Sequence, residues 1–161
     1  MTADRLTTPL CFGVIGCGQW GPNHNRTFNH QPGCRVLLCA DLDPARLARM
    51  RRLHPQTRGT TDYREIIDHP YIQAVVVATP TGTHHKIVSE ALQAGKDVLV
   101  EKPLADSLPR ARALAELASR KKRILMVGQI VRFIPATIEM RRICGRAQTV
   151  SSLRVRSSQQ P

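Results

Sequence analysis

Aromatic and acidic residues are scarce in this sequence. Aromatic residues make up 4% of the 161 residues, too few for the stacking platforms on which single-stranded nucleic acids bind. Only 12 Asp and Glu face 24 Lys and Arg, which gives a net charge of +12. The electrostatic field of a chain with this net positive charge attracts polyanions, so one hypothesis is that the chain binds nucleic acid. Because the basic residues recur at helical spacing in 46–52 and 110–123, we favour solvated helix faces and expect no nucleic-acid partner.

Long apolar runs and paired cysteines are also lacking. No run approaches the roughly 20 apolar residues that span a bilayer, and the first residues do not resemble a secretory signal. We therefore expect a cytoplasmic protein without a membrane partner. The five cysteines include no C-x-x-C pair, which argues against a zinc site or a disulfide framework, and no metal site is predicted. Cys17 is interpreted as a small packing residue, with a reactive thiol as the alternative.

Short apolar segments alternate with amphipathic segments along most of the chain. Strands are predicted at 10–15, 35–40, 57–60, 74–78, 97–100 and 124–127, and helices at 22–29, 44–54, 62–67, 86–93, 108–121 and 135–143. This alternation with short connections predicts an α/β fold, a doubly wound parallel sheet of the Rossmann type. After Gly128 the pattern changes, and residues 149–156 alternate enough to form one more strand.

A glycine motif directly follows the first predicted strand. Gly16, Gly18 and Gly21 form the pattern G-x-G-x-x-G and precede a predicted helix. In a dinucleotide-binding turn the first glycine permits the tight turn, the second lets the backbone approach a pyrophosphate, and the third allows helix and strand to pack closely. The helix would direct its free N–H groups toward that pyrophosphate. Alone, the pattern also fits an ordinary glycine-rich loop.

Asp41 lies twenty residues after Gly21, at the end of the second predicted strand. An acidic side chain there can accept hydrogen bonds from the adenosine ribose hydroxyls. Its carboxylate would repel a 2′-phosphate, so we expect NAD rather than NADP as cofactor. The alternative is that Asp41 or Asp43 caps the helix that begins near Pro44, and both roles can hold at once.

Two polar loops follow later strands. One contains Thr79, Pro80, Thr81 and His84, and the other is Glu101-Lys102-Pro103. Because ligands bind at the carboxyl ends of strands in open α/β sheets, both loops are candidate parts of the same site. From the residues alone, His84 also fits a structural histidine, and Lys102 also fits a surface lysine paired with Glu101.

The glycine motif, Ala40-Asp41, the segment 78–84 and the segment 95–104 (GKDVLVEKPL) together resemble the Gfo/Idh/MocA oxidoreductases. The resemblance implies that Gly16, Gly18, Gly21 and the backbone of Gln19 and Trp20 hold the pyrophosphate and that Asp41 binds the ribose. It places Thr79, Pro80, Thr81 and His84 along the nicotinamide, and Glu101, Lys102 and Pro103 beneath it. Lys102 is the expected catalytic residue, contacting the substrate hydroxyl that is oxidised.

Within the family, GQWGPNHNRTF followed by CADLDP resembles members that oxidise UDP-linked amino-sugar uronic acids. A sugar or sugar-nucleotide substrate is therefore expected, and a homo-oligomer is a further expectation. Family members carry a second, mainly β domain that supplies much of the substrate pocket. We expect an N-terminal tail at 1–9, an NAD-binding domain at 10–145, and at 146–161 a tail or the start of a truncated second domain.

Two classes of function remain open at this point. One is an NAD-dependent sugar dehydrogenase in which Lys102 relays the hydroxyl proton while hydride leaves for the nicotinamide. The other is a non-catalytic NAD-binding module.

Overall fold

The structure, a computed structural model, describes residues 9–144 of the chain. The chain divides into two compact units, Met1–Gly128 and Gln129–Pro161. The first unit contains the sheet and every candidate site residue.

A six-stranded parallel sheet forms the centre of the first unit, with the order β3-β2-β1-β4-β5-β6. The strands are β1 (Leu10–Ile15), β2 (Cys34–Ala40), β3 (Arg58–Thr60), β4 (Ala74–Val77), β5 (Asp97–Val100) and β6 (Leu125–Val127). The strand order reverses direction between β1 and β4, which is the topological switch point where α/β sheets bind ligands. The predicted doubly wound sheet is thereby confirmed.

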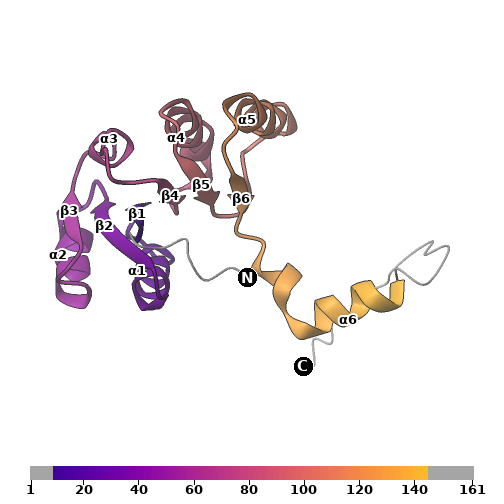
Figure 1. The fold of residues 1–161 in the computed structure, drawn as a ribbon, viewed down its shortest axis with the longest axis horizontal. Coiled ribbons are helices and arrows are strands. Elements are labelled where there is room, and N and C mark those ends of the chain that lie inside the picture. The colour runs from indigo at the N-terminus through magenta and orange to yellow at the C-terminus, as the bar shows by residue number, and fades with distance from the viewer. Residues whose placement is uncertain (1–8, 145–161) are drawn as a thin grey trace, which may run out of the picture. The chain divides into compact units, whose positions relative to one another are not determined.

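Helices cover both faces of this sheet. They are α1 (Gly21–His30), α2 (Pro44–Leu53), α3 (Arg64–Ile67), α4 (Thr81–Gln93) and α5 (Leu108–Lys121). Figure 1 shows α1 and α2 on one face, and α3, α4 and α5 on the other. The two faces bury separate apolar clusters: Phe12, Val14, Val36 and Met50 lie in the first, with Phe28 of α1 packed against it. The second holds Val75, Val77, Leu92 and Leu114 among others. Strands buried on both faces explain the continuous apolar runs of the sequence.

The start of α4 differs from the prediction. Residues 79–84 were expected to form a loop before a helix at 86–93, but the helix begins at Thr81. Pro80, with φ −58°, stands just before the helix, and its carbonyl accepts a 2.9 Å hydrogen bond from the Thr83 N–H. Gly82 lowers the helix propensity of this turn, which is why the residue types alone suggest a loop.

The second unit contains a 3₁₀ helix, η1 (Ile130–Phe133), and the helix α6 (Pro135–Cys144). The helix predicted at 135–143 is thus present, whereas the strand predicted at 149–156 and the segment 146–161 lie outside the described residues. Within 9–144, no helix combines the length and the apolar character needed to cross a membrane.

Candidate functional site

The glycine turn connects β1 to α1 at the carboxyl edge of the sheet. Gly16 has φ +97°, and a Cβ at this position would lie 2.5 Å from the carbonyl oxygen of Ala78. A Cβ on Gly21 would lie 2.0 Å from the carbonyl oxygen of Gly16, so both positions require glycine for close packing. At Gly18 the space is open apart from the Arg46 guanidinium at 3.8 Å. The turn therefore presents bare backbone to the solvent side at Gly18.

Asp41 is held directly against this turn. Its Oδ2 accepts a 2.7 Å hydrogen bond from the backbone N–H of Cys17, and its Oδ1 accepts a 2.9 Å bond from the N–H of Asp43. The Arg46 guanidinium lies 3.5 Å from Oδ2. A carboxylate offers about four acceptor positions, so it retains acceptor capacity for a ribose hydroxyl. The side chain of Asp41 is only 9% exposed, which keeps this arrangement ordered.

Asp43 carries out the capping role that was the alternative for either aspartate. Its Oδ1 accepts a 2.8 Å hydrogen bond from the N–H of Ala45, and Pro44 follows in the first helical turn. One aspartate therefore caps α2 while the other contacts the glycine turn, as the sequence allowed.

A cavity of about 900 Å³ opens beside the turn and Asp41. Gly16, Gly18, Gln19 and Trp20 line it from the turn, and Thr79 and Pro80 line it from the loop after β4. Other lining residues belong to no recognisable motif and were not predicted from the sequence: Leu42, Arg46, Thr61, Tyr63, Thr83 and Lys86. The Tyr63 hydroxyl donates a 2.8 Å hydrogen bond to Glu90, and burial followed by this bond raises the pKa of Tyr63.

His84 does not line this cavity, and its expected place along the nicotinamide stays a prediction. It is 1% exposed and lies in the first turns of α4. Its Nε2 lies 2.8 Å from the carbonyl oxygen of Thr79, and its Nδ1 lies 2.8 Å from that of Pro103. Both ring nitrogens are engaged with backbone, so His84 connects the loop after β4 to the turn after β5. Thr81, at the start of α4, is likewise absent from the residues that line the cavity.

Glu101 is hydrogen-bonded to a histidine, a contact that the sequence did not predict. Its Oε1 lies 2.8 Å from Nε2 of His24, on α1. Among the described residues no ion pair joins Glu101 to Lys102, so the interpretation of Lys102 as its salt-bridge partner is wrong. Lys102 is exposed, and the peptide bond between Lys102 and Pro103 is cis. None of these three turn residues lines the 900 Å³ cavity, which lies on the Asp41 side of the sheet edge.

Cys17 is buried behind the turn at 1% exposure, close to the fully buried Cys39 of β2. The contact with the Cys39 thiol and then burial raise the pKa of Cys17. A thiolate is the reactive form of cysteine, and the Cys17 thiol is buried with its Sγ 3.6 Å from the carbonyl oxygen of Ala40, which favours the packing interpretation. Within residues 9–144, no three His, Cys, Asp or Glu side chains gather as a metal site.

The residues at this edge fit an adenine dinucleotide. The open space at Gly18 admits a phosphate against the backbone, and α1 begins at Gly21 with its N-terminus at the same turn. Helix N-termini favour phosphate through their free N–H groups and dipole. Asp41 places a carboxylate beside this turn on the side of β2, where it could accept from a ribose hydroxyl. Donor groups and acceptor groups thus occur in the order in which a dinucleotide presents its phosphates and ribose.

Comparison with known proteins identifies relatives of the chain. An inositol 2-dehydrogenase of Saccharopolyspora erythraea is 37% identical over 133 residues, which are 81% of this chain and 39% of that protein. The scyllo-inositol 2-dehydrogenase (NAD(+)) of Bacillus subtilis is 32% identical over 80% of this chain and 38% of its own length. The chain therefore spans about two fifths of the length of these relatives. Both are named for inositols and not for amino-sugar uronic acids.

Solved structures match over a similar share of their chains. Myo-inositol 2-dehydrogenase from Lactobacillus plantarum matches with a TM-score of 0.78 and 25% identity, over 86% of this chain and 41% of that chain. Biliverdin reductase from Synechocystis, solved with biliverdin and NADP⁺, matches with a TM-score of 0.79 and 27% identity, over 86% and 43%. Residues 10–129 match the family described as "Oxidoreductase family, NAD-binding Rossmann fold". Because this match covers most of the chain, the protein belongs to the Gfo/Idh/MocA oxidoreductase family, of which it contains the NAD(P)-binding Rossmann fold.

Proposed function

We propose that the chain binds NAD at the carboxyl edge of its sheet, with NADP bound more weakly. The observation that carries this proposal is the 2.7 Å hydrogen bond between Asp41 Oδ2 and the Cys17 N–H. It brings a carboxylate from the end of β2 onto the glycine turn 24 residues away. In a dinucleotide site this juxtaposition places the ribose acceptor beside the pyrophosphate turn.

The preference for NAD rests on charge. The Asp41 carboxylate would repel a 2′-phosphate on the adenosine ribose, whereas it accepts hydrogen bonds from a free 2′-hydroxyl. Arg46, at 3.5 Å from Asp41, partly offsets this repulsion. Since the Arg46 side chain is 54% exposed, its attraction is screened by solvent. We therefore expect weakened NADP binding and not its complete exclusion.

For the reaction, we propose oxidation of a ring hydroxyl in a polyhydroxylated substrate. The bound nicotinamide would accept the hydride, and Lys102 would contact the substrate hydroxyl and relay its proton. Lys102 suits this role because it is exposed and follows β5 at the carboxyl edge. The names of the relatives favour a cyclic polyol such as an inositol over the UDP-linked uronic acid expected from the sequence.

A second candidate is a non-catalytic NAD-binding module. The cavity favours it because its lining comes from the glycine turn, Asp41 and the loop after β4, without Glu101, Lys102 or Pro103. The described residues thus enclose the space beside Asp41, where the cofactor would bind, more completely than the space beside Lys102, where a substrate would react.

Trp20 provides the experiment that tests binding. It is the single tryptophan of the chain, is 40% exposed, and lines the cavity. Titration with NAD should change its fluorescence saturably, with a micromolar-class dissociation constant. Asp41→Asn should weaken the response, whereas Asp62→Asn, which changes an exposed aspartate outside the cavity, should not. A fluorescence signal that stays flat with folded protein would contradict the proposal.

An activity assay distinguishes the dehydrogenase from the non-catalytic NAD-binding module. NADH formation from inositols or from UDP-linked uronic acids, lost in Lys102→Ala while NAD binding persists, would support the dehydrogenase. Saturable NAD binding without NADH formation from any of these substrates would favour the binding module.

A further inference from the structure

His24 and Glu101 form a partly enclosed hydrogen-bonded pair that the proposed binding of NAD leaves without a role. Their side chains are 19% and 13% exposed, and the Nε2 to Oε1 distance is 2.8 Å. The two residues are 77 positions apart and come from α1 and from the end of β5. The pair lies at the carboxyl edge of the sheet, where open α/β sheets bind their ligands. We therefore consider a role for it in ligand binding.

A third element fixes the Glu101 carboxylate in place. A Cβ built on Gly128, just after β6, would lie 3.3 Å from Glu101 Oε2 and 3.4 Å from its Cδ. The carboxylate therefore lies between the first turns of α1 on one side and the backbone after β6 on the other. His24 fixes one oxygen, and the close approach of Gly128 limits the room around the other.

The topology indicates which part of the cofactor would meet this carboxylate. This step rests on the proposed binding of NAD. Asp41 follows β2, so the adenosine would lie on the β2 side of the switch point between β1 and β4. The pyrophosphate would lie at the glycine turn after β1. The second nucleotide would then extend over β4 and β5, where Glu101 follows Val100 at the carboxyl end of β5.

We propose that Glu101, positioned by His24, makes the site favour oxidised over reduced nicotinamide. The ring of NAD⁺ carries a positive charge that NADH lacks, and the two are otherwise nearly the same in shape. A fixed and largely buried carboxylate at the carboxyl edge of the sheet attracts the oxidised ring and gives no such attraction to the reduced ring. Glu101 is then a specificity-determining residue, and His24 is a positioning residue that acts through it.

The position of the carboxylate matters as much as its charge. A glutamate side chain has several rotamers, and a mobile carboxylate at the surface would be screened by water. The hydrogen bond from α1 selects one rotamer at the ligand edge. Replacement of His24 by an apolar residue would release this rotamer, whereas glutamine can still donate a hydrogen bond to the carboxylate.

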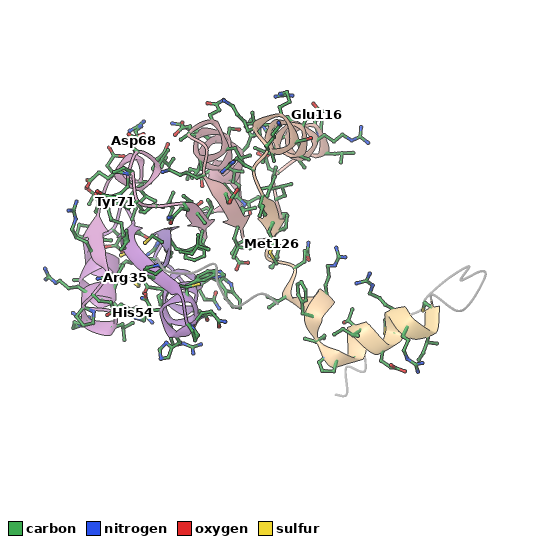
Figure 2. All side chains as sticks on the ribbon, viewed as in Figure 1. Arg35, His54, Asp68, Tyr71, Glu116 and Met126 are labelled. Atoms are coloured by element: carbon green, nitrogen blue, oxygen red, sulfur yellow. The ribbon has the colours of Figure 1, made fainter. Side chains whose placement is uncertain are left out.

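The test compares dissociation constants for NAD⁺, NADH and ADP-ribose in the full chain. ADP-ribose shares the adenosine, the pyrophosphate and the second ribose with NAD but has no nicotinamide. The variants are Glu101→Gln, His24→Leu and His24→Gln. The control is Glu116→Gln, which removes the same charge from an exposed side chain on the outer side of α5 (Figure 2).

Glu101→Gln and His24→Leu should lower the ratio Kd(NADH)/Kd(NAD⁺) by about threefold to tenfold, as expected for one partly screened charge pair. His24→Gln should restore part of the ratio, Glu116→Gln should leave it unchanged, and ADP-ribose affinity should stay the same in all variants. A merely structural role would weaken all three ligands together.

An unchanged ratio in Glu101→Gln, or equal losses for ADP-ribose and NAD⁺, would overturn the inference while NAD binding itself stands. Failure of the unchanged chain to bind any of the three ligands would instead overturn the proposed function, and this inference with it.

Discussion

The Asp41 carboxylate and the Cys17 N–H, joined by a 2.7 Å hydrogen bond, connect the end of β2 to the turn between β1 and α1. The second carboxylate oxygen accepts from Asp43, which in turn caps α2. The acidic residue is therefore oriented before any ligand binds. Preorganisation of this kind lowers the ordering cost of binding.

Asp41→Asn is expected to weaken NAD binding about tenfold and to narrow the difference between NAD and NADP, because a charge-assisted hydrogen bond is replaced by a neutral one. Parallel calorimetric titrations of both nucleotides measure this. Asp62→Asn is the control for loss of an exposed aspartate charge. Equal affinities for NAD in Asp41→Asn and the unchanged chain would contradict the role of Asp41.

Gly16→Ala is expected to lower the free energy of unfolding by about 2 kcal/mol or more, since it combines a strained φ with a steric clash. The φ is +97°, and the added Cβ would lie 2.5 Å from the Ala78 carbonyl oxygen. Urea denaturation measures the change. Gly82→Ala is the matched control, because a Cβ there meets no atom within 4 Å and its position in α4 favours alanine. Similar stabilities of the two variants would refute the steric argument.

His84→Leu is expected to cost about 2 to 4 kcal/mol of stability, because it removes a buried ring that donates a hydrogen bond to one backbone carbonyl and packs against a second. These are the carbonyls of Thr79 and Pro103, each 2.8 Å from a ring nitrogen. Thermal and urea unfolding report the loss, and substitution of the half-buried neighbour, His85→Leu, should cost much less. Equal losses of unfolding free energy in His84→Leu and His85→Leu would show that the contacts of His84 contribute little to stability.

His54 is expected to make the protein less stable in mild acid. Burial lowers the pKa of His54 below its ordinary value of 6.5, against a hydrogen bond to the Pro22 backbone that raises it. The unfolded chain then binds a proton more readily than the folded chain. The contribution of His54 is therefore fully present above pH 6.5 and decreases as pH falls from 6.5 through the folded-state pKa.

His54→Gln should accordingly flatten the decline of unfolding free energy below pH 6.5, measured by urea denaturation at several pH values. His85→Gln serves as the control. A slope in His54→Gln that matches the unchanged chain would show that another group causes the decline.

Much of the fold follows from local sequence signals. The runs at β1, β4 and β5 are apolar and short, and each is followed by turn residues, so strands and their parallel arrangement are predictable. The helix at 108–121 is predicted at its observed bounds because its apolar residues recur at helical spacing. The start of α4 is missed because Gly82 and two threonines weaken a helix that tertiary contacts of His84 stabilise.

The candidate site is predictable only where its residues form a motif. The spacing of Gly16, Gly18 and Gly21 identifies the glycine turn, and Asp41 is identified by its position twenty residues after Gly21 in the sequence. The pair His24 and Glu101 has no such signal, because a single histidine on a helix carries no information about a residue 77 positions away. Tyr63 and Lys86 were missed for the same reason, since only folding brings them to the cavity.

Calorimetric titration of the folded chain with NAD will show whether the glycine turn and Asp41 form an NAD site. We expect a saturable heat of binding to one site per chain with micromolar-class affinity, weakened in Asp41→Asn. No heat of binding to a chain shown to be folded by circular dichroism would contradict it.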